Sequence, residues 1–537
     1  MKIFRLIHIG LVFARYRIDG IVLTTPWFYP FRFLRLLNPF QYIPGQKLSR
    51  GERIRIALEK LGPIFVKFGQ VLSTRRDWLP DDIASELEKL QDNVKPFPGK
   101  KAREIIRKSL KKPTHQLFKH FSDTALASAS IAQVHAAELM DGTPIVVKVL
   151  RPKVEKQVQR DMSLLKLAAR FCQAVLPNGQ NARPMAVVAE FERHLKNELD
   201  LTLEAANAAQ LARNLEKDDL VGIPAVYWDY CAKNVLALER VDGIPISHMK
   251  QLKSSDIDLK QLASSAIDMF FTQVFRDNFF HADLHPGNIF VAKRASGKPK
   301  FLLVDFGVAG TLSATDQRYI AENLLAFFKR DYQRVADLHV ASGWLPPDTR
   351  AHEFAIQIRA ISEPFFEKPL KDISIGLLLL RLFQTARRFN IIIQPQLILL
   401  QKNLLHIESI SRQLDPDLDL WQTAKPFLER WLKTQVGPRA VLRKVCQQLP
   451  YWGEKLPELP ELVYQFLQQS TSPTPSHAPQ TQYSKAPAAR GGLIAGIMFL
   501  FASTLVFATA PQAHIAGWVL FGVGVGSAVL SFLKRLA

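Results

Sequence analysis

The segment His281-Ala282-Asp283-Leu284-His285-Pro286-Gly287-Asn288 decides the fold, together with Asp305-Phe306-Gly307, which begins seventeen residues after Asn288. An aspartate followed at the fifth position by asparagine, and then a second aspartate that opens D-F-G, is the arrangement by which phosphotransferases hold a general base and magnesium ligands. The spacing therefore predicts a phosphotransfer active site.

Chemistry assigns one role to each of three polar residues. Asp283 is the expected catalytic base, which accepts or orients the proton of the nucleophile. Asn288 and Asp305 are the expected metal ligands, because Mg²⁺ on ATP phosphates prefers oxygen donors. Two apolar runs, 288–291 and 301–304, predict short strands that bring both ligands to one edge, as in a kinase C-lobe. The alternative is that these residues only cap turns.

Two further parts of a kinase site are expected upstream. Residues 144–150 form a β-branched run with a single lysine, Lys148, which we expect to hold the nucleotide phosphates. Residues 184–215 have helical periodicity, and we expect an acidic residue of that helix to pair with Lys148. The candidates are Glu198, Asp200 and Glu204. Four parts in this order predict a kinase-like fold.

An alanine-rich segment, 125–135, stands where a kinase carries its glycine-rich phosphate loop, and it contains no glycine. Alanine disfavours the positive φ angles and the close backbone approach that glycine permits. The nucleotide should therefore sit differently from its pose in a protein kinase, which argues against ordinary protein phosphorylation. We assign ATP contacts to Lys148, Glu204 and the loop residues Ala125, Leu126, Ala127, Ser128, Ala129, Ser130, Ile131, Ala132 and Gln133.

Another motif precedes this lobe. Lys67-Phe68-Gly69-Gln70, taken alone, is part of an amphipathic helix. Together with Ala127-Ser128-Ala129-Ser130 and Glu198-Leu199-Asp200 it resembles the UbiB family of atypical kinases, the aarF-domain proteins, whose marks are K-x-G-Q, an alanine-rich loop and E-x-D. The resemblance runs from about residue 50 to residue 470. Three further segments extend it to the proteobacterial members: 271–277, 342–349 and 412–416.

The resemblance implies a regulatory extension that contains Lys67 and Gln70 and lies over the pocket. Lys67 would engage Glu198 and Asp200, and Glu204 would pair with Lys148. The resemblance therefore implies that protein-kinase activity is suppressed. It also implies ATP and Mg²⁺ as cofactors, and either ATP hydrolysis or phosphorylation of a small lipid-like molecule as the reaction. The family also implies ubiquinone biosynthesis, with quinone precursors or other ubiquinone-biosynthesis proteins as partners.

Two other functions stay open. The first is a small-molecule or protein kinase that acts on an unknown acceptor, because choline-type and aminoglycoside-type kinases share H-x-D-x-x-x-x-N, although they lack the K-x-G-Q extension. A nucleotide-sensing scaffold without turnover would need Lys148 and Asp305 for binding but would not depend on Asp283.

Composition points to a membrane. The chain has 70 Lys and Arg against 49 Asp and Glu, a net charge of +21, which suits anionic inner-membrane lipids. No nucleic-acid-binding module is recognisable, so we expect no nucleic-acid partner. Residues 493–510 and 515–533 carry no charge and are nearly as long as a membrane-spanning helix, so we expect two transmembrane helices. Basic residues flank the pair, at Arg490 and at Lys534 and Arg535, which predicts that both ends are cytoplasmic.

Two G-x-x-x-G motifs accompany these apolar segments: Gly492, directly before the first segment, with Gly496 inside it, and Gly522 with Gly526 in the second. They predict close helix contact and permit either a closed hairpin or a homodimer. Residues 470–490 read as a flexible linker. The N-terminal segment has no signal-peptide cleavage site, and the aromatic and arginine residues of 27–35 suit either a membrane interface or packing against the kinase-like domain.

The predicted fold is α+β and bilobal, anchored in the bacterial inner membrane with the kinase-like domain on the cytoplasmic side. Apolar spacing predicts helices over 261–275, 319–329, 395–410 and 424–433, and hence a mostly helical C-lobe. The predicted parts are an interfacial segment (1–50), the K-x-G-Q extension (51–120), the N-lobe (121–243), the C-lobe (244–469), the linker (470–490) and two transmembrane helices (491–534).

Overall fold

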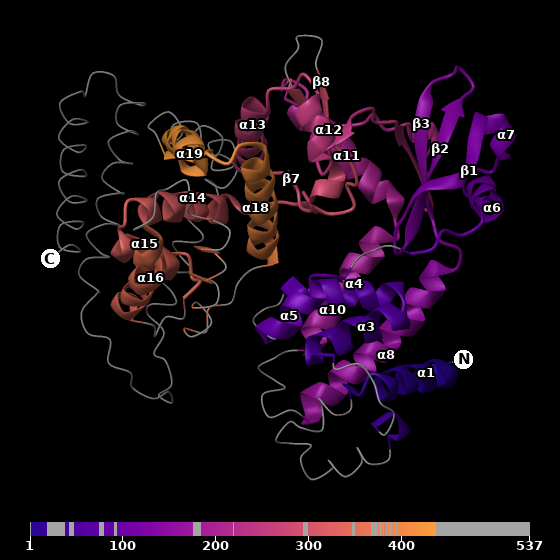
Figure 1. Cartoon of the computed structure of the whole chain (residues 1–537), viewed down its shortest axis with the longest axis horizontal. Coiled ribbons are helices and arrows are strands. Elements are labelled where there is room, and N and C mark those ends of the chain that lie inside the picture. The colour runs from indigo at the N-terminus through magenta and orange to yellow at the C-terminus, as the bar shows by residue number, and fades with distance from the viewer. Residues whose placement is uncertain are drawn as a thin grey trace, which may run out of the picture. The chain divides into compact units, whose positions relative to one another are not determined.

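The computed structural model describes part of the chain. The described residues are 2–18, 38–41, 48–74, 80–90, 94–175, 184–218, 220–293, 299–345, 350–366, 374, 378–379, 381–382, 385, 389, 391 and 395–436. The chain forms two compact units, Met1–Lys444 and Val445–Ala537, and every described residue belongs to the first. Figure 1 shows helices and small sheets in that unit, which confirms the α+β class and the kinase-like lobes.

The N-lobe is built on an antiparallel sheet with the strand order β1-β2-β3-β5. Burial alternates along β3, where Ile145, Val147 and Val149 are fully buried in the cluster that includes helix α6. Because side chains alternate along a strand, Lys148 faces the opposite side of the sheet. The elements are α6 (Gly99–Leu110), α7 (Thr114–Leu117), β1 (Phe118–Ser128), β2 (Ala132–Leu139), β3 (Pro144–Leu150), η3 (Trp228–Tyr230) and β5 (Val235–Glu239).

The N-terminal extension packs with two long helices that follow β3 into one apolar cluster. Gly69 allows helix α4 to approach its neighbours, because a Cβ at this position would overlap the side chains of Leu90 and Leu58. This close packing orients Lys67, two residues earlier on the same helix. The elements are α1 (Lys2–Arg15), η2 (Pro39–Gln41), α3 (Arg50–Leu61), α4 (Pro63–Thr74), α5 (Asp81–Leu87), α8 (Val154–Val175) and α10 (Pro184–Glu198).

The single helix predicted over 184–215 is wrong at the E-x-D motif. Helix α10 ends at Glu198, and helix α11 (Leu201–Leu215) begins two residues after Leu199. Asp200 has an extended backbone with φ −123°, and its side chain accepts a hydrogen bond from Thr202 N. The aspartate therefore serves as an N-cap, a role that Asp fills readily, and it starts a new helix at this point.

Small sheets position the catalytic segments of the C-lobe. One has the order β4-β9-β8-β6 and the other pairs β10 with β7. β8 and β9 are antiparallel neighbours, with Ile289 opposite Leu303, which confirms the two strands predicted beside the metal ligands. The elements are β4 (Val221–Gly222), β6 (Ile244–Pro245), β7 (Phe280–His281), η5 (Pro286–Asn288), β8 (Ile289–Lys293), β9 (Pro299–Leu303) and β10 (Ala309–Gly310).

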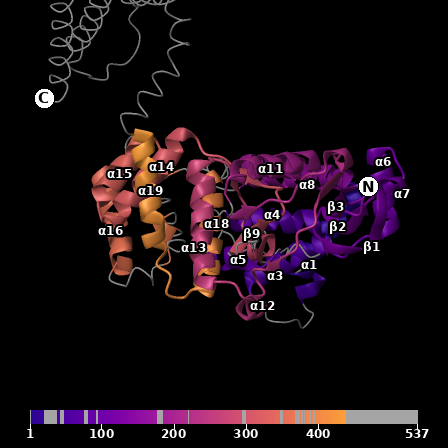
Figure 2. The ribbon, with the colours of Figure 1, turned by 90° about the horizontal axis from the view of Figure 1, so that it is seen from above.

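Helices make up the rest of the C-lobe, and the four predicted helical segments are confirmed. Figure 2 shows α13 and α18 side by side, and α19 packs against α13. A π-helical turn, η4 (Thr272–Arg276), continues α13, a feature that is frequent at functional sites. The helices are α12 (Met249–Ser254), α13 (Leu259–Phe271), α14 (Ala314–Phe328), α15 (Tyr332–Ala341), α16 (Ala351–Phe366), α18 (Pro395–Leu414) and α19 (Leu420–Val436).

Within the described part of the chain, no helix is both long enough and apolar enough to cross a lipid bilayer. The predicted spans 493–510 and 515–533, the linker 470–490 and the aromatic segment 27–35 all lie outside the described residues.

An ion pair ties helix α1 to helix α8. Arg5 Nε and Nη2 donate to the two carboxylate oxygens of Asp161 at 3.0 and 2.9 Å, and Nη2 also donates to Leu61 O at 2.7 Å. Asp161 is fully buried. This contact fastens α1 to α8 and to the end of α3.

Replacing Arg5 with Ala should lower the free energy of unfolding by about 2–3 kcal/mol, because a buried carboxylate loses its main cation while Arg160 Nε remains near it. Chemical denaturation of both proteins measures this difference. The matched control is Arg50→Ala, which removes a solvent-exposed pair with Asp82 and should change stability much less. Equal losses in the two variants would contradict a stabilising role for the buried pair.

Candidate phosphotransfer site

A lysine between two carboxylates forms the centre of the site. Lys148 Nζ donates to Glu204 Oε1 and Oε2 at 2.7 and 2.9 Å and to Asp305 Oδ1 at 2.9 Å. Glu204 on α11 is buried, whereas the side chain of Asp305 is 50% exposed. The Lys148–Glu204 pair expected from the sequence is present, and Asp305 shares its ammonium group.

The charges in this cluster shift the pKa values of its members. Burial raises the pKa of Glu204 to about 7; Asp305 adds to this rise and Lys148 opposes it. The Lys148 ammonium holds the pKa of Asp305 far below its usual range. Burial opposes the charged form of Lys148, but Asp305 and Glu204 together raise its pKa above the usual lysine value. Because one ammonium faces two carboxylates, an additional cation would be favoured here.

His281 holds the catalytic loop in shape. Its Nδ1 accepts a hydrogen bond from Asp283 N, and its Nε2 donates to Val304 O, each at 3.1 Å. Gln273, on the π turn, accepts from His281 N at 3.0 Å. Burial lowers the pKa of His281, so the neutral ring that these two contacts require is favoured. His281 therefore fixes the shape of this loop.

Asn288 and Asp305 offer the oxygen donors that a magnesium ion takes. Asn288 Nδ2 donates to Asp283 O at 3.0 Å, so the amide oxygen is the atom of this side chain that could bind a metal. Val304 N donates to Asn288 O at 3.0 Å, so the loop that carries Asn288 lies beside the strand that leads to Asp305. Two such oxygens fit a Mg²⁺ ion that takes its other ligands from phosphates and water.

The D-F-G segment has an unusual backbone. Asp305 has φ +61°, in the left-handed region that Asp and Asn enter more readily than most residues. Asn207 on α11 donates to Phe306 O at 3.0 Å, and the Phe306 ring meets His281 edge to face. These neighbours stabilise a conformation of the kind that is concentrated at functional segments.

Helix α18 contributes two site residues that the sequence analysis missed. Lys402 Nζ donates to Asp283 Oδ1 at 2.7 Å. Asn403, fully buried, donates to His281 O at 2.7 Å and accepts from Leu284 N at 2.9 Å. Burial acts to raise the pKa of Asp283, but Lys402 and the nearby histidines hold it below the usual aspartate value. The signal that could have revealed these two residues is the run of polar side chains inside an otherwise apolar helix. Polar side chains are rarely buried in a core without a partner.

The alanine-rich loop is only partly at the cleft. Ala129, Ser130, Ile131 and Ala132 line it, between the ends of β1 and β2. Ser128 instead accepts a hydrogen bond from Arg151, as does the carbonyl of Ala129. The first part of the predicted loop, Ala125 to Ser128, belongs to strand β1.

Gln133, also assigned to ATP, has a different role in the structure. Its side chain is buried and bonds to both the N–H and the carbonyl of Phe97, and it contacts His135. These bonds fasten the segment before α6 to the N-lobe sheet. Gln133 therefore acts as a structural support for the loop.

The extension reaches the cleft through Lys67. Lys67 Nζ donates to Glu198 Oε1 at 2.7 Å, as the family resemblance implies. Asp200 lines the same cleft, but its carboxylate accepts from the backbone and hydroxyl of Thr202. Gln70 donates to Leu90 O at 3.1 Å and so fastens α4 to the segment after α5. Of the four predicted extension residues, Lys67 and Glu198 thus form an ion pair in the lining of the cleft.

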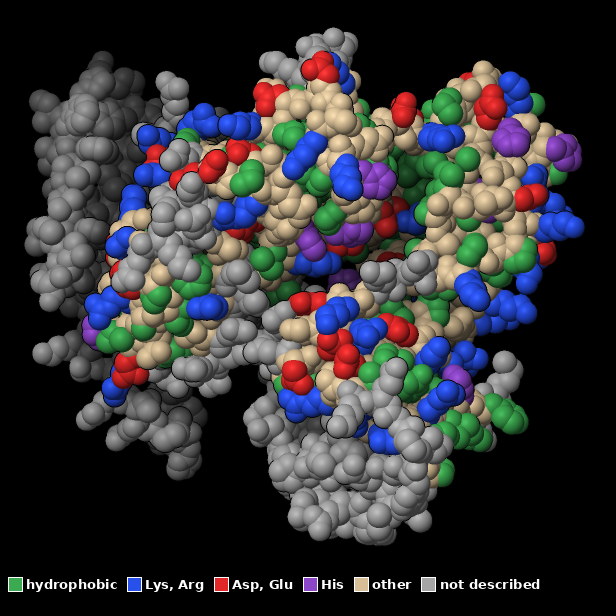
Figure 3. Space-filling view, viewed as in Figure 1, with side chains coloured by type: hydrophobic (Ala, Val, Ile, Leu, Met, Phe, Trp, Pro, Cys, Tyr) green, Lys and Arg blue, Asp and Glu red, His purple; other side chains and the backbone are tan. Residues whose placement is uncertain are grey.

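Lys67, Lys148, Asp283 and Asp305 line one cleft of about 70 Å³. Small-molecule sites usually have several hundred Å³, so admission of a nucleotide requires part of the lining to move. Figure 3 shows a hollow at this level of the molecule, with acidic and basic side chains inside it.

Comparisons with known proteins give the family of the chain. The chain matches a model of the ABC1 atypical kinase-like domain over residues 89–339 and a model of the UbiB helical domain over residues 358–419, which contains Lys402 and Asn403. A protein of Marinobacter nauticus named probable protein kinase UbiB is 52% identical over 474 residues, 88% of this chain and 87% of that protein. A Pseudomonas aeruginosa protein of the same name is 48% identical over 526 residues, 97% of this chain and 98% of that protein.

A solved structure from Mycobacterium tuberculosis, titled the complex structure of Rv3197 and erythromycin, has a TM-score of 0.46 and 20% identity, and it covers 68% of this chain and 93% of that chain. The family assignment rests on the family models and on the two full-length relatives. The chain belongs to the UbiB family of proteins with an ABC1 atypical kinase-like domain.

Proposed function

We propose that this chain is an atypical kinase or ATPase that binds Mg-ATP and acts in ubiquinone biosynthesis. The observation that carries the proposal is the convergence of Lys148, Asp283 and Asp305 on one cleft. A phosphate-binding ammonium, a carboxylate base and a metal-binding carboxylate are the parts that phosphoryl transfer requires.

Each residue has a task in the proposed reaction. Bound Mg-ATP supplies the phosphoryl group. Lys148, positioned by Glu204, binds the phosphates, and Asn288 and Asp305 hold the metal. Asp283 orients the attacking hydroxyl or water and accepts its proton, and its low pKa keeps it in the basic form at neutral pH.

The extension favours a small acceptor over a protein. Lys67 and Glu198 form an ion pair in the lining of the cleft, whose volume is small. The family resemblance implies that the extension covers the side that a polypeptide substrate would use. We therefore propose water or a small lipid-like molecule as the acceptor, with quinone precursors as the candidates that the family suggests.

An anionic bacterial inner membrane is the proposed setting, with the kinase-like domain on its cytoplasmic side. The exposed apolar residues Phe4, Ile7 and Leu11 lie on one stripe of α1, and the chain carries a net charge of +21. Figure 3 shows hydrophobic side chains gathered where α1 lies. An apolar helix face beside basic charge suits the interface of an anionic bilayer.

A nucleotide-gated scaffold without turnover is the second candidate. The Lys402–Asp283 ion pair favours it, because a base held by an ammonium is withdrawn from proton transfer. The two functions differ in whether Asp283 must accept a proton.

Asp283→Asn should reduce ATP hydrolysis by about 10²–10⁴-fold with little change in Mg-ATP affinity, because the amide cannot act as a base. Turnover and nucleotide binding are measured on the full-length chain with and without anionic vesicles. Asp256→Asn, at a solvent-exposed aspartate that pairs with Lys293, is the control and should behave as the parent. Unchanged quinone levels in cells that carry Asp283→Asn would favour the scaffold.

Lys402→Met should move the acidic limb of the pH–rate profile to higher pH. Lys402 helps to hold the pKa of Asp283 down, so its loss raises the pH at which the base becomes deprotonated. The measurement is ATP turnover against pH, compared with Lys425→Met, an exposed lysine on α19. A lower rate at every pH without a shift of the limb would mean that Lys402 acts only through folding.

Lys67→Ala should raise autophosphorylation with Mg-ATP severalfold, because removing the Lys67–Glu198 contact opens the cleft to a polypeptide acceptor. Incorporation of labelled phosphate measures the effect. Lys60→Ala, at an exposed lysine of α3, is the matched control. No increase over the parent chain would refute the view that Lys67 excludes proteins.

A further inference from the structure

The backbone around Asp283 depends on side chains for its hydrogen bonds, because the short strand β7 ends at His281. Past the strand, Asp283 N donates to the ring of His281 at 3.1 Å. The next backbone group, Leu284 N, donates to Asn403 Oδ1 at 2.9 Å. Buried backbone groups need hydrogen-bond partners, so these side chains determine the path of the catalytic loop.

Asn403 bonds to the loop on both sides of Asp283. Its Nδ2 donates to His281 O at 2.7 Å, and its Oδ1 is the acceptor for Leu284 N. The Asn403 side chain is fully buried, so both bonds lie away from water. Loss of one partner in such a place leaves the other group desolvated and unpaired, which costs more than an exposed bond would. Because one planar amide makes both bonds, it fixes the spacing between the residues that flank the base.

A second buried amide holds the same part of the loop from another element. Gln273, on the π turn η4, is fully buried and accepts from His281 N at 3.0 Å. Asn403 takes the carbonyl of the same residue. The N–H and the C=O of His281 are therefore both bonded to side-chain amides, one from η4 and one from α18. Since the His281 ring bonds in turn to Asp283 N, groups outside the loop specify where the base stands.

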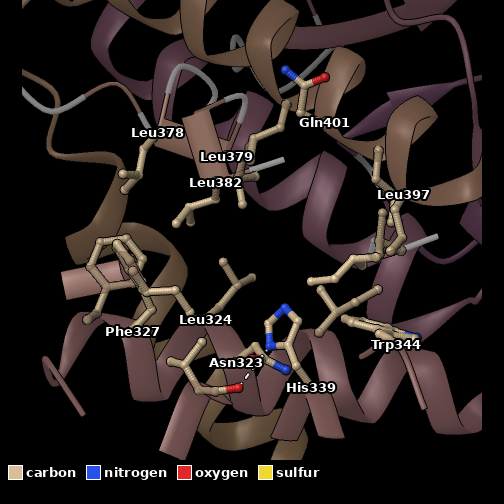
Figure 4. A pocket seen from close by; sticks show the side chains of 18 of the residues that line it. Asn323, Leu324, Phe327, His339, Trp344, Leu378, Leu379, Leu382, Leu397 and Gln401 are labelled. Carbon is tan, nitrogen blue, oxygen red and sulfur yellow. Dashed lines mark hydrogen bonds between the residues drawn. The ribbon is translucent and has the colours of Figure 1, made fainter. Parts of the chain in front are cut away.

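Helix α18 is itself anchored in the C-lobe. Leu397 and Gln401 line an apolar cavity there, and both are labelled in Figure 4. Leu404 belongs to the buried cluster that α18 shares with α13, and Ser411 donates to Ala263 O of α13 at 3.2 Å. Asn403 therefore projects from a packed helix, and such a support holds a functional group more precisely than a loop does.

We propose that Asn403 is a positioning residue for the catalytic base, and that the UbiB helical domain thereby completes the phosphotransfer site. The match to the kinase-like domain, residues 89–339, contains Asp283, whereas the match to the helical domain, residues 358–419, contains Asn403. Asn403 does not line the cleft, so it acts through the loop. The role of Asp283 as the base rests on the proposed function; the hold of Asn403 on the loop does not.

Asn403 and its neighbour Lys402 act on different properties of Asp283. Lys402 donates to the carboxylate and helps to hold its pKa down. Asn403 bonds to the backbone on either side and sets the position of the carboxylate. A displacement of about 1 Å in a reacting group can cost about 10²-fold in rate. Loss of Asn403 should therefore lower kcat and leave the affinity for nucleotide unchanged.

Hydrogen–deuterium exchange of the full-length chain tests the hold on the loop without any need for turnover. Asn403→Leu keeps the size of the side chain and removes both bonds, so the Leu284 amide should exchange about tenfold faster, as read by mass spectrometry. Ser411→Ala is the matched control, because it removes another buried bond of α18 and should leave this amide unchanged. Melting curves check that each variant folds. Unchanged exchange in Asn403→Leu would overturn the proposal.

ATP turnover and nucleotide affinity are measured on the same variants. Asn403→Leu should lower kcat about 10²-fold and keep the Kd for Mg-ATP within about twofold, whereas Ser411→Ala should behave as the parent. A Kd that rises as much as kcat falls would mean that Asn403 supports the whole cleft, and it would refute a positioning role. If the parent chain never hydrolyses ATP while Asn403→Leu still speeds exchange at Leu284, the proposed function fails and the hold on the loop stands.

Asn403→Asp tests whether the two bonds themselves position the base. A protonated carboxyl donates and accepts as the amide does, whereas a carboxylate cannot donate to His281 O. Burial and this carbonyl favour the protonated form, as does Asp283; Lys402 opposes it, and His406 is neutral because burial lowers its pKa to about 4. Turnover of Asn403→Asp relative to the parent should therefore fall as the pH rises, and that of Asn403→Leu should stay low throughout. Parallel pH profiles of the two variants would contradict the proposal.

Discussion

The ammonium of Lys148 between Glu204 and Asp305 is the interaction on which the rest of the site depends. It joins three elements that are distant in sequence: strand β3, helix α11 and the D-F-G segment. The alternation of β3 turns Lys148 away from the N-lobe core, and Asp200 starts α11 at the point that brings Glu204 to the same position. Because both carboxylates are partly or fully removed from water, the cluster is stable only while a cation stays between them.

The same chemistry recurs twice around the cleft. Lys402 holds Asp283, and Lys67 holds Glu198. Each of the three lysines Lys67, Lys148 and Lys402 is therefore paired with a carboxylate, and two of these carboxylates, Asp283 and Asp305, are the ones that the proposed phosphoryl transfer would need. A nucleotide brings several negative charges with it, so its arrival would compete for the lysines, and a metal cation would compete for Asp305. The cleft has the charged residues of a kinase site, but its lysines and carboxylates form ion pairs with one another.

Local sequence patterns and family motifs were enough to predict several structural features. The strands beside Asn288 and Asp305, the four C-lobe helices and the Lys148–Glu204 pair follow from periodicity, spacing and family motif. The break between α10 and α11 was missed because Asp200 can continue a helical pattern as well as cap a new helix. Lys402 was missed because its partner, Asp283, is 119 residues away, and a polar residue in an apolar helix does not reveal which group it contacts. Gln133 was assigned to ATP by its place in the loop, whereas its side chain faces Phe97.

The three ion pairs formed by Lys148, Lys402 and Lys67 differ in how easily they can break. Lys148 bonds to two carboxylates, and Lys402 lies on a helix that Asn403 fastens to the catalytic loop on both sides of Asp283. Glu198, in contrast, uses Oε1 for Lys67 while its Oε2 is buried without a hydrogen bond to the described residues. A buried acceptor without a partner destabilises its own arrangement, so this pair has the least to lose when it opens. If the cleft widens to admit a nucleotide, as the proposed function requires, movement of α4 or of the turn between α10 and α11 would break the weakest of the three pairs, and control of the site would then lie in the N-terminal extension.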